Sequence, residues 1–134
     1  EVGTGSGYQA AILGHLGARV FSVERQEELY FKTKNLLRRL SVGNIRLYFR
    51  DGYAGLPEFA PFDKILVTAG APELPAALLE QMAIGGLLVI PVDKPDEKGQ
   101  QMMRVTRLSD TSYEQEVFGD FRFVPFLKGK VRKE

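Results

Sequence analysis

The chain opens with Glu1-Val2-Gly3-Thr4-Gly5-Ser6-Gly7, and this stretch decides the fold class. Three glycines at alternate positions fit neither a helix interior nor a regular strand, because glycine weakens both, so they predict a tight loop. The residues that follow, 8–16, are rich in Ala, Ile and Leu and predict a short helix that stops at Gly17. A glycine loop that opens a helix leaves backbone amides bare, so that a polar or anionic ligand can approach them closely.

Strand-like and helical segments alternate after this loop. The pattern predicts strands over 19–24, 45–49, 62–67 and 87–92, and helices over 26–40 (with a stripe of Leu29, Leu36, Leu37 and Leu40) and 75–82. Such alternation indicates βαβ units, a parallel sheet and right-handed crossovers. Two last runs, 103–108 and 113–118, flank a polar turn and predict a β-hairpin. We therefore expect an α/β fold with a mostly parallel sheet and a C-terminal antiparallel β-hairpin at its edge.

Three further segments are given local interpretations. The polar stretch 93–101 predicts an exposed turn, and the charged tail 128–134 is expected to be frayed. The aromatic residues Phe118, Phe121, Phe123 and Phe126 are expected to pack as core under the sheet edge.

Composition removes several classes of function. The 134 residues suit one domain, and the net charge of +1 gives no support to a nucleic-acid-binding face. There is no cysteine and only one histidine, so that thiol nucleophiles, Cys-based metal sites and multi-His metal sites are excluded. No apolar run approaches the roughly 18 residues of a membrane span. We expect no metal site, no nucleic-acid partner and no membrane partner.

Carboxylates and small residues close the predicted strands. Glu24 ends the first run, about 20 positions after Gly3, where a carboxylate can accept hydrogen bonds from both hydroxyls of a ribose. Asp51-Gly52 ends the next strand, and Thr68 follows the one after it. Ligands of open α/β sheets bind at the carboxyl ends of the strands, so these residues predict a site for an adenosine-containing ligand. An ordinary strand–helix turn remains the alternative for the glycines alone.

Two well-known nucleotide motifs fit less well. The spacing here is G-x-G-x-G, whereas the dinucleotide fingerprint needs a small residue where Tyr8 stands, which disfavours a nicotinamide or flavin enzyme. The phosphate loop of NTPases ends in Gly-Lys-Ser/Thr, which is absent.

Several segments together carry a resemblance to a known family. They are Glu1–Ala11, Val23-Glu24-Arg25, Arg50-Asp51-Gly52, 62–72, 75–92 and Phe123-Val124-Pro125. The first looks like motif I of S-adenosylmethionine-dependent methyltransferases, and its Gly-Tyr-Gln-Ala-Ala form resembles the protein-L-isoaspartate O-methyltransferase family. The resemblance covers nearly the whole chain and implies a Rossmann-like methyltransferase sheet.

The resemblance also implies a reaction and a site. S-adenosylmethionine would give its methyl group to the α-carboxylate of L-isoaspartyl residues in damaged proteins, leaving S-adenosylhomocysteine, and the ester would collapse to a succinimide. The cofactor-binding residues implied are Glu1, Gly3, Thr4, Gly5, Ser6, Gly7, Glu24, Arg25, Asp51, Gly52 and Thr68. A carboxylate is already a nucleophile at neutral pH, so no general base is required, and alignment of the reactants can carry catalysis.

One part of the family pattern has no counterpart in these residues. The family has an N-terminal portion with a Ser/Thr that contacts the substrate carboxylate, which would lie upstream of Glu1, so the catalytic residue is unknown. We expect a single methyltransferase domain over 1–134, truncated within its first strand, with weak cofactor binding and little turnover. Isoaspartyl peptides and proteins are the expected partners and the cytoplasm the expected location. A methyltransferase for another small molecule, or a cofactor-binding fragment without activity, are the alternatives, and the sequence does not set the oligomeric state.

Overall fold

A computed structural model describes residues 1–134, and the chain divides into two compact units. Unit 1 consists of Glu1–Gly52 together with Lys128–Glu134, and unit 2 consists of Tyr53–Leu127. Each unit has its own sheet, and the two are described in turn.

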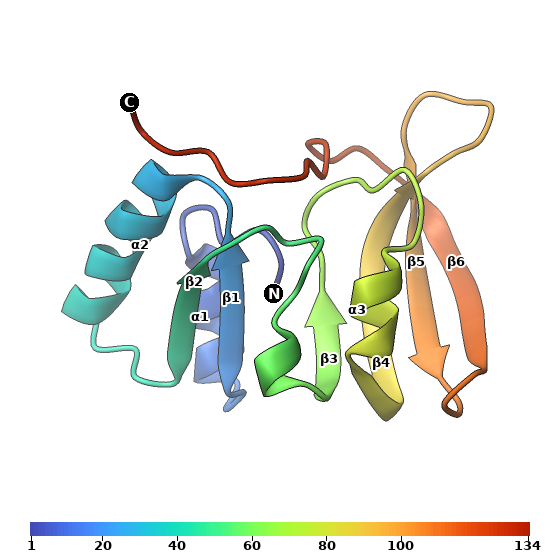
Figure 1. The fold of residues 1–134 in the computed structure, drawn as a ribbon, viewed down its shortest axis with the longest axis horizontal. Helices are drawn as coiled ribbons and strands as arrows, with labels where there is room; N and C mark the ends of the chain where they lie inside the picture. The colour runs from blue at the N-terminus through green and yellow to red at the C-terminus, as the bar shows by residue number, and fades with distance from the viewer. The chain divides into compact units, whose positions relative to one another are not determined.

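Unit 1 is a parallel strand pair with two helices (Figure 1). Its elements, in chain order, are α1 (Tyr8–His15), β1 (Val20–Glu24), α2 (Glu27–Arg39) and β2 (Ile45–Phe49). β1 and β2 pair in parallel, from Val20 opposite Ile45 to Glu24 opposite Phe49, as the sequence predicts. Val2 forms a single parallel bridge with Val23, so the chain before the glycine loop runs alongside β1.

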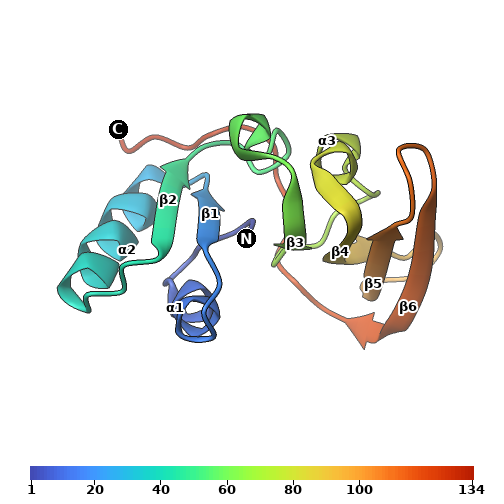
Figure 2. The ribbon, with the colours of Figure 1, turned by 90° about the horizontal axis from the view of Figure 1, so that it is seen from below.

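Both helices of unit 1 pack on the same face of this strand pair (Figure 2). Gly14 of α1 lies so close to Ile45 that a Cβ on the glycine would be 3.4 Å from its Cδ1. On α2, the ring of Tyr30 lies 6.0 Å from that of Phe49. Ile45 and Phe49 point to one face because side chains alternate along a strand. As a result, the carboxyl ends of β1 and β2 lie on the same side of the unit as the first residues of both helices.

The burial of the helices departs from the apolar pattern in two places. On α2, Leu37 is buried but Leu40 is 60% exposed, because the helix ends at Arg39; Thr33 takes a buried position instead. On α1 the buried residues are Ala10 and Gly14, which allow a close approach to the sheet, whereas Tyr8, Ile12 and Leu16 are exposed.

Unit 2 is built on a four-stranded sheet in the order β3-β4-β5-β6. Its elements are η1 (Pro57–Phe59), β3 (Phe62–Leu66), α3 (Ala76–Glu80), β4 (Met82–Asp93), β5 (Gln100–Arg107) and β6 (Tyr113–Phe121). β3 and β4 are parallel, and the β4–β5 and β5–β6 pairs are antiparallel. The predicted hairpin at the edge is thus confirmed, while parallel pairing between whole strands holds for β1–β2 and β3–β4.

The strands of unit 2 are longer than their apolar patterns predict. β4 begins at Met82 rather than Leu87, and the predicted turn at 93–101 shrinks because β4 continues to Asp93 and β5 starts at Gln100. Backbone pairing between the long strands extends them beyond their apolar runs. The core of unit 2 contains Leu78, Leu88, Ile90 and Val105, all almost fully buried.

The aromatic residues near the end of unit 2 do not form one core cluster. Phe126 is buried and stacks on Tyr53, with ring centroids 4.0 Å apart. Phe118 and Phe121 lie on the edge strand β6 and are about half exposed, so the prediction of core packing is wrong for these two. An edge strand has no neighbour on its outer side to cover such side chains.

Candidate functional site

The glycine loop of unit 1 is held against the carboxyl end of β1. Gly3, Gly5 and Gly7 all have left-handed backbone angles, with φ of 98°, 54° and 81°. The backbone N–H groups of Gly3 and Thr4 both donate to the carbonyl oxygen of Val23, at 2.9 and 3.2 Å. L-residues with side chains rarely adopt these angles, so the loop requires glycine at each position.

Glu24 ties this loop to the start of α2. Its carboxylate accepts the N–H of Gly5 at 2.9 Å with one oxygen and the N–H of Gln26 at 2.8 Å with the other. The side chain of Thr33, on α2, donates to the carbonyl oxygen of Gly5 at 2.6 Å. Glu24 is 5% exposed and Thr33 is 2% exposed, so both side chains are shielded from water.

Gly5 and Gly7 serve different purposes. A Cβ on Gly7 would lie 2.6 Å from Cγ2 of Thr33, so this glycine lets the loop pack on α2. A Cβ on Gly5 would have no heavy atom within 4 Å. No neighbouring protein atom therefore requires Gly5 to lack a side chain; its φ does, and the open space on its Cα leaves room for a ligand to lie against it. Ser6, between them, is exposed.

A polar network lies under the loop. The carboxylate of Glu1 accepts hydrogen bonds from Ser22 Oγ at 2.5 Å and from Gln9 Nε2 at 2.9 Å. The hydroxyls of Ser22 and Thr4 share a further hydrogen bond of 2.6 Å. The sequence did not predict three residues of this network and of the loop contact: Ser22, Gln9 and Thr33. The signal for Ser22 was a polar residue inside a strand, and for Thr33 a hydroxyl on the buried side of a helix.

Asp51 and Arg25 lie at the ends of β2 and β1, and both contact the tail. Asp51 Oδ2 accepts the backbone N–H of Gly129 at 2.8 Å. Arg25 Nε donates to the carbonyl oxygen of Gly129 at 3.0 Å. Arg25 Nη2 donates to the carbonyl oxygen of Lys128 at 3.4 Å. The tail is therefore docked on residues 1–52 of the same unit, and the prediction that it is frayed is wrong for these residues. Gly52 is buried directly after Asp51.

Thr68 lies in unit 2, and all the other predicted cofactor residues lie in unit 1. The segment after Thr68 is tightly fixed: Gly70 donates its N–H to Val124 O at 2.7 Å and accepts the N–H of Phe126 at 2.8 Å. The side chain of Gln100 lies against Gly70, where a Cβ would be 2.7 Å from its Cδ. The Gln100 amide accepts the N–H of Phe123 and donates to Asp93.

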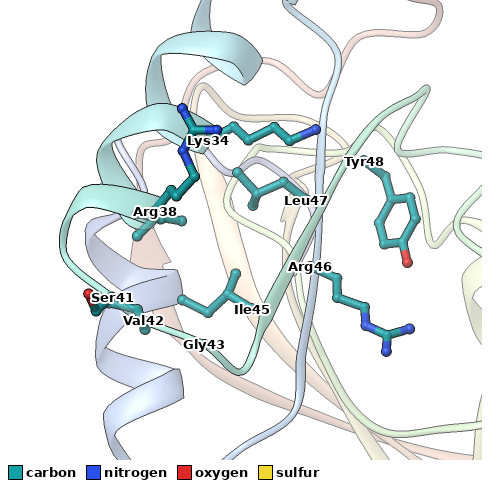
Figure 3. A pocket seen from close by; sticks show the side chains of 10 residues that line it. Lys34, Arg38, Ser41, Val42, Gly43, Ile45, Arg46, Leu47 and Tyr48 are labelled. Carbon is teal, nitrogen blue, oxygen red and sulfur yellow. The ribbon is translucent and has the colours of Figure 1, made fainter.

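A groove of about 500 Å³ lies elsewhere in unit 1, between α2 and the outer side of β2 (Figure 3). Ile45 and Leu47 point into it from β2, and Lys34 and Arg38 line it from α2. None of the predicted cofactor residues lines it. We do not assign it to the adenosine ligand.

Two general features of the structure bear on its chemistry. No cluster of three or more His, Asp or Glu side chains is arranged to hold a metal ion. Of the three α-helices, the longest has 13 residues, and none is long and apolar enough to cross a bilayer.

The geometry of unit 1 suits an adenosine-containing ligand. A glycine loop precedes α1, one carboxylate ends β1, and a second carboxylate follows the neighbouring parallel strand. The loop and α1 lie beside one end of β1, and the two carboxylates offer acceptors for ribose hydroxyls and a base amine. This arrangement and the α/β sheets define the class of Rossmann-like methyltransferases. Residues 1–131 match the sequence model of the family "Protein-L-isoaspartate(D-aspartate) O-methyltransferase (PCMT)", and the chain belongs to this family.

Curated relatives and solved structures agree with this assignment. The chain is 55% identical over 130 residues to the protein-L-isoaspartate O-methyltransferases of Flavobacterium psychrophilum and Christiangramia forsetii. Each match covers 97% of this chain and 60% of the relative, so the chain spans about 60% of the length of these relatives.

Two solved structures share the fold. A protein-L-isoaspartate O-methyltransferase structure superposes with a TM-score of 0.86 at 29% identity, over 92% of this chain and 40% of that one. A putative protein-L-isoaspartate O-methyltransferase from Plasmodium falciparum, in complex with S-adenosyl-L-homocysteine, gives a TM-score of 0.77 at 26% identity. That match covers 96% of this chain and 64% of the other.

Proposed function

We propose that this chain carries the cofactor site of an enzyme that methylates the α-carboxylate of L-isoaspartyl residues in damaged proteins, with S-adenosylmethionine as methyl donor. The observation that carries the proposal is the buried carboxylate of Glu24, fixed between the backbone of Gly5 and the start of α2. Family membership supports the reaction, and the Plasmodium relative solved with S-adenosylhomocysteine supports the donor.

In this proposal each part of the site holds one part of the cofactor. The loop Gly3-Thr4-Gly5-Ser6-Gly7 holds the methionine portion, and Glu1 faces its amino group. Glu24 accepts from the ribose hydroxyls, since each carboxylate oxygen has further acceptor capacity beyond one backbone N–H. Asp51, with Gly52, flanks the base and accepts from its amine. Thr68 is assigned no contact here, because it belongs to unit 2.

The chemistry asks little of ionisable side chains. When bound, the sulfonium of S-adenosylmethionine supplies an electrophilic methyl group, and the substrate carboxylate is a nucleophile without loss of a proton. The contribution of this chain is therefore to bind and orient, through the rigid loop and the two strand ends. A site without cysteine and with one histidine is compatible with such a reaction.

Two measurements on the same preparation test the proposal. Calorimetry with S-adenosylhomocysteine, with NAD as the comparison ligand, tests the cofactor site. Transfer of a labelled methyl group to an isoaspartyl peptide, against the same peptide with normal aspartate, tests the reaction. Binding with selective transfer supports the proposal in full. Binding without transfer assigns the chain a cofactor-binding role alone. Binding of NAD instead of S-adenosylhomocysteine would overturn the proposed function.

A further inference from the structure

The tail of the chain is joined to the rest of unit 1 by a short strand-like pairing. Val131 bridges Gln26 in parallel, its N–H donates to Arg25 O at 2.7 Å, and its carbonyl accepts the N–H of Glu27 at 2.9 Å. The N–H of Lys133 donates to Glu27 Oε2 at 3.0 Å. These bonds join the tail to residues that directly follow Glu24.

The tail also crosses the end of β2 (Figure 1). Gly129 donates to Asp51, and the ammonium group of Lys130 lies 5.2 Å from the ring centroid of Phe49, the last residue of that strand. Gly129 has a left-handed φ of 80°, and this turn directs its N–H toward the carboxylate. The segment therefore spans the carboxyl ends of β1 and β2, where the ribose and base contacts are proposed.

Arg25 is the side chain that fastens this segment. Its guanidinium donates to the backbone oxygens of Gly129 and Lys128, on the side of the tail that faces unit 1. A guanidinium carries several donors in a rigid fork, so it can hold two carbonyls in one arrangement, which a flexible lysine cannot reproduce. The sequence predicts that Arg25 binds the cofactor. In the structure, its guanidinium forms hydrogen bonds with the backbone of the tail.

We propose that Lys128–Val131 form the outer wall of the base-binding part of the cofactor site, and that Arg25 is the positioning residue that holds this wall in place. The inference rests on the proposed cofactor site. It assigns a role to a segment that the glycine loop and the strand ends do not explain. Bound cofactor then lies beside Asp51 and against the tail, so the tail must loosen for the ligand to leave.

The test combines ligand dissociation with hydrogen exchange. Arg25→Ala is compared with Arg132→Ala, an exposed arginine in the same tail, and with the conservative Arg25→Lys. Stopped-flow displacement measures the dissociation rate of S-adenosylhomocysteine. Exchange at the amides of Gly129 and Val131 is measured with and without that ligand. We expect Arg25→Ala to dissociate the ligand about tenfold faster, since charge-assisted hydrogen bonds hold the wall, with only partial recovery in Arg25→Lys.

Each outcome is decisive for the wall. Ligand should slow exchange at Gly129 and Val131 in the wild-type chain and in Arg132→Ala, and much less in Arg25→Ala. A merely structural arginine would lower the melting temperature but leave the dissociation rate and the ligand-induced slowing unchanged, and that result overturns the inference while the proposed function stands. A wild-type chain that does not bind S-adenosylhomocysteine at all overturns both.

Discussion

The carboxylate of Glu24 accepts the backbone N–H of Gly5 at 2.9 Å, so the end of β1 and the loop before α1 are locked to each other. The other oxygen holds Gln26 at the start of α2. One buried side chain thus fixes the two segments that the proposed cofactor touches, and ligand affinity should be coupled to the stability of unit 1.

Replacement of Glu24 by glutamine tests this coupling. The amide of Glu24→Gln has one acceptor oxygen, so its NH₂ group must face one of two N–H donors. A hydrogen bond to a charged group contributes about 1.5–3 kcal/mol, so we expect the free energy of unfolding to fall by about 2 kcal/mol. The affinity for S-adenosylhomocysteine should fall at least about tenfold. Urea denaturation followed by circular dichroism, and calorimetry, measure the two effects.

Glu28→Gln is the matched control, because Glu28 is exposed on α2, the helix whose start Glu24 holds, and its carboxylate forms an ion pair only with Lys133, at 3.9 Å. Exposed ion pairs contribute little, so this variant should behave like the wild type. Equal affinity for the ligand in Glu24→Gln and Glu28→Gln would show that Glu24 does not contact the ligand.

Alanine at the loop glycines should separate packing from binding. In Gly7→Ala the new Cβ meets Thr33 at 2.6 Å and the backbone is strained, so unfolding should become markedly easier. In Gly5→Ala the Cβ enters open space, and the left-handed backbone costs about 1–2 kcal/mol. We expect Gly5→Ala to lose ligand affinity far beyond its modest loss of stability.

Gly17→Ala provides the reference for backbone strain alone. Gly17 also has a left-handed φ, 89°, with no heavy atom within 4 Å of an added Cβ, and it stands at the opposite end of α1. Gly5→Ala and Gly17→Ala should have similar melting temperatures and very different affinities for S-adenosylhomocysteine. Similar affinities would show that the open space at Gly5 is not ligand space.

Asp51→Asn should change the preference for the base. An asparagine keeps an oxygen for the N–H of Gly129 and replaces the other acceptor by an NH₂ donor. Binding of S-adenosylhomocysteine, whose base presents an amine, should weaken about tenfold. S-inosylhomocysteine presents a carbonyl at that position, so its affinity should fall less or should rise. Competition calorimetry with both ligands gives the ratio, with the exposed Asp110→Asn as control; an unchanged ratio would place the base elsewhere.

Gln100→Ala should loosen the segment around Gly70 in unit 2. The substitution removes the acceptor for Phe123 N–H and the side chain packed on Gly70, and an unsatisfied donor costs about 1–3 kcal/mol. Exchange at the amides of Phe123 and Gly70 should accelerate together. Gln101→Ala, whose side chain points to the other face of β5, should leave both rates unchanged. Acceleration in neither variant would mean that backbone pairing with Val124 and Phe126 suffices.

The sequence predicted the elements better than their ends. Strand and helix order, the glycine loop and the carboxylates at the strand ends follow from local patterns, because a turn needs glycine and a helix face needs a stripe. Leu40 was misplaced because the pattern continues beyond the residue at which α2 ends. The docked tail was missed because its bonds join residues about 100 positions apart, and a charged run says nothing of a partner so distant. Thr33 illustrates the same limit, since its role is a hydrogen bond to the carbonyl of Gly5, 28 positions earlier in the chain.

The pairing of Val131 with Gln26 makes unit 1 discontinuous along the chain. During translation, residues 1–52 leave the ribosome before unit 2, and the segment that closes over the ends of β1 and β2 leaves only after it. A frameshift after Leu127 therefore removes contacts of strands β1 and β2, which were made before unit 2.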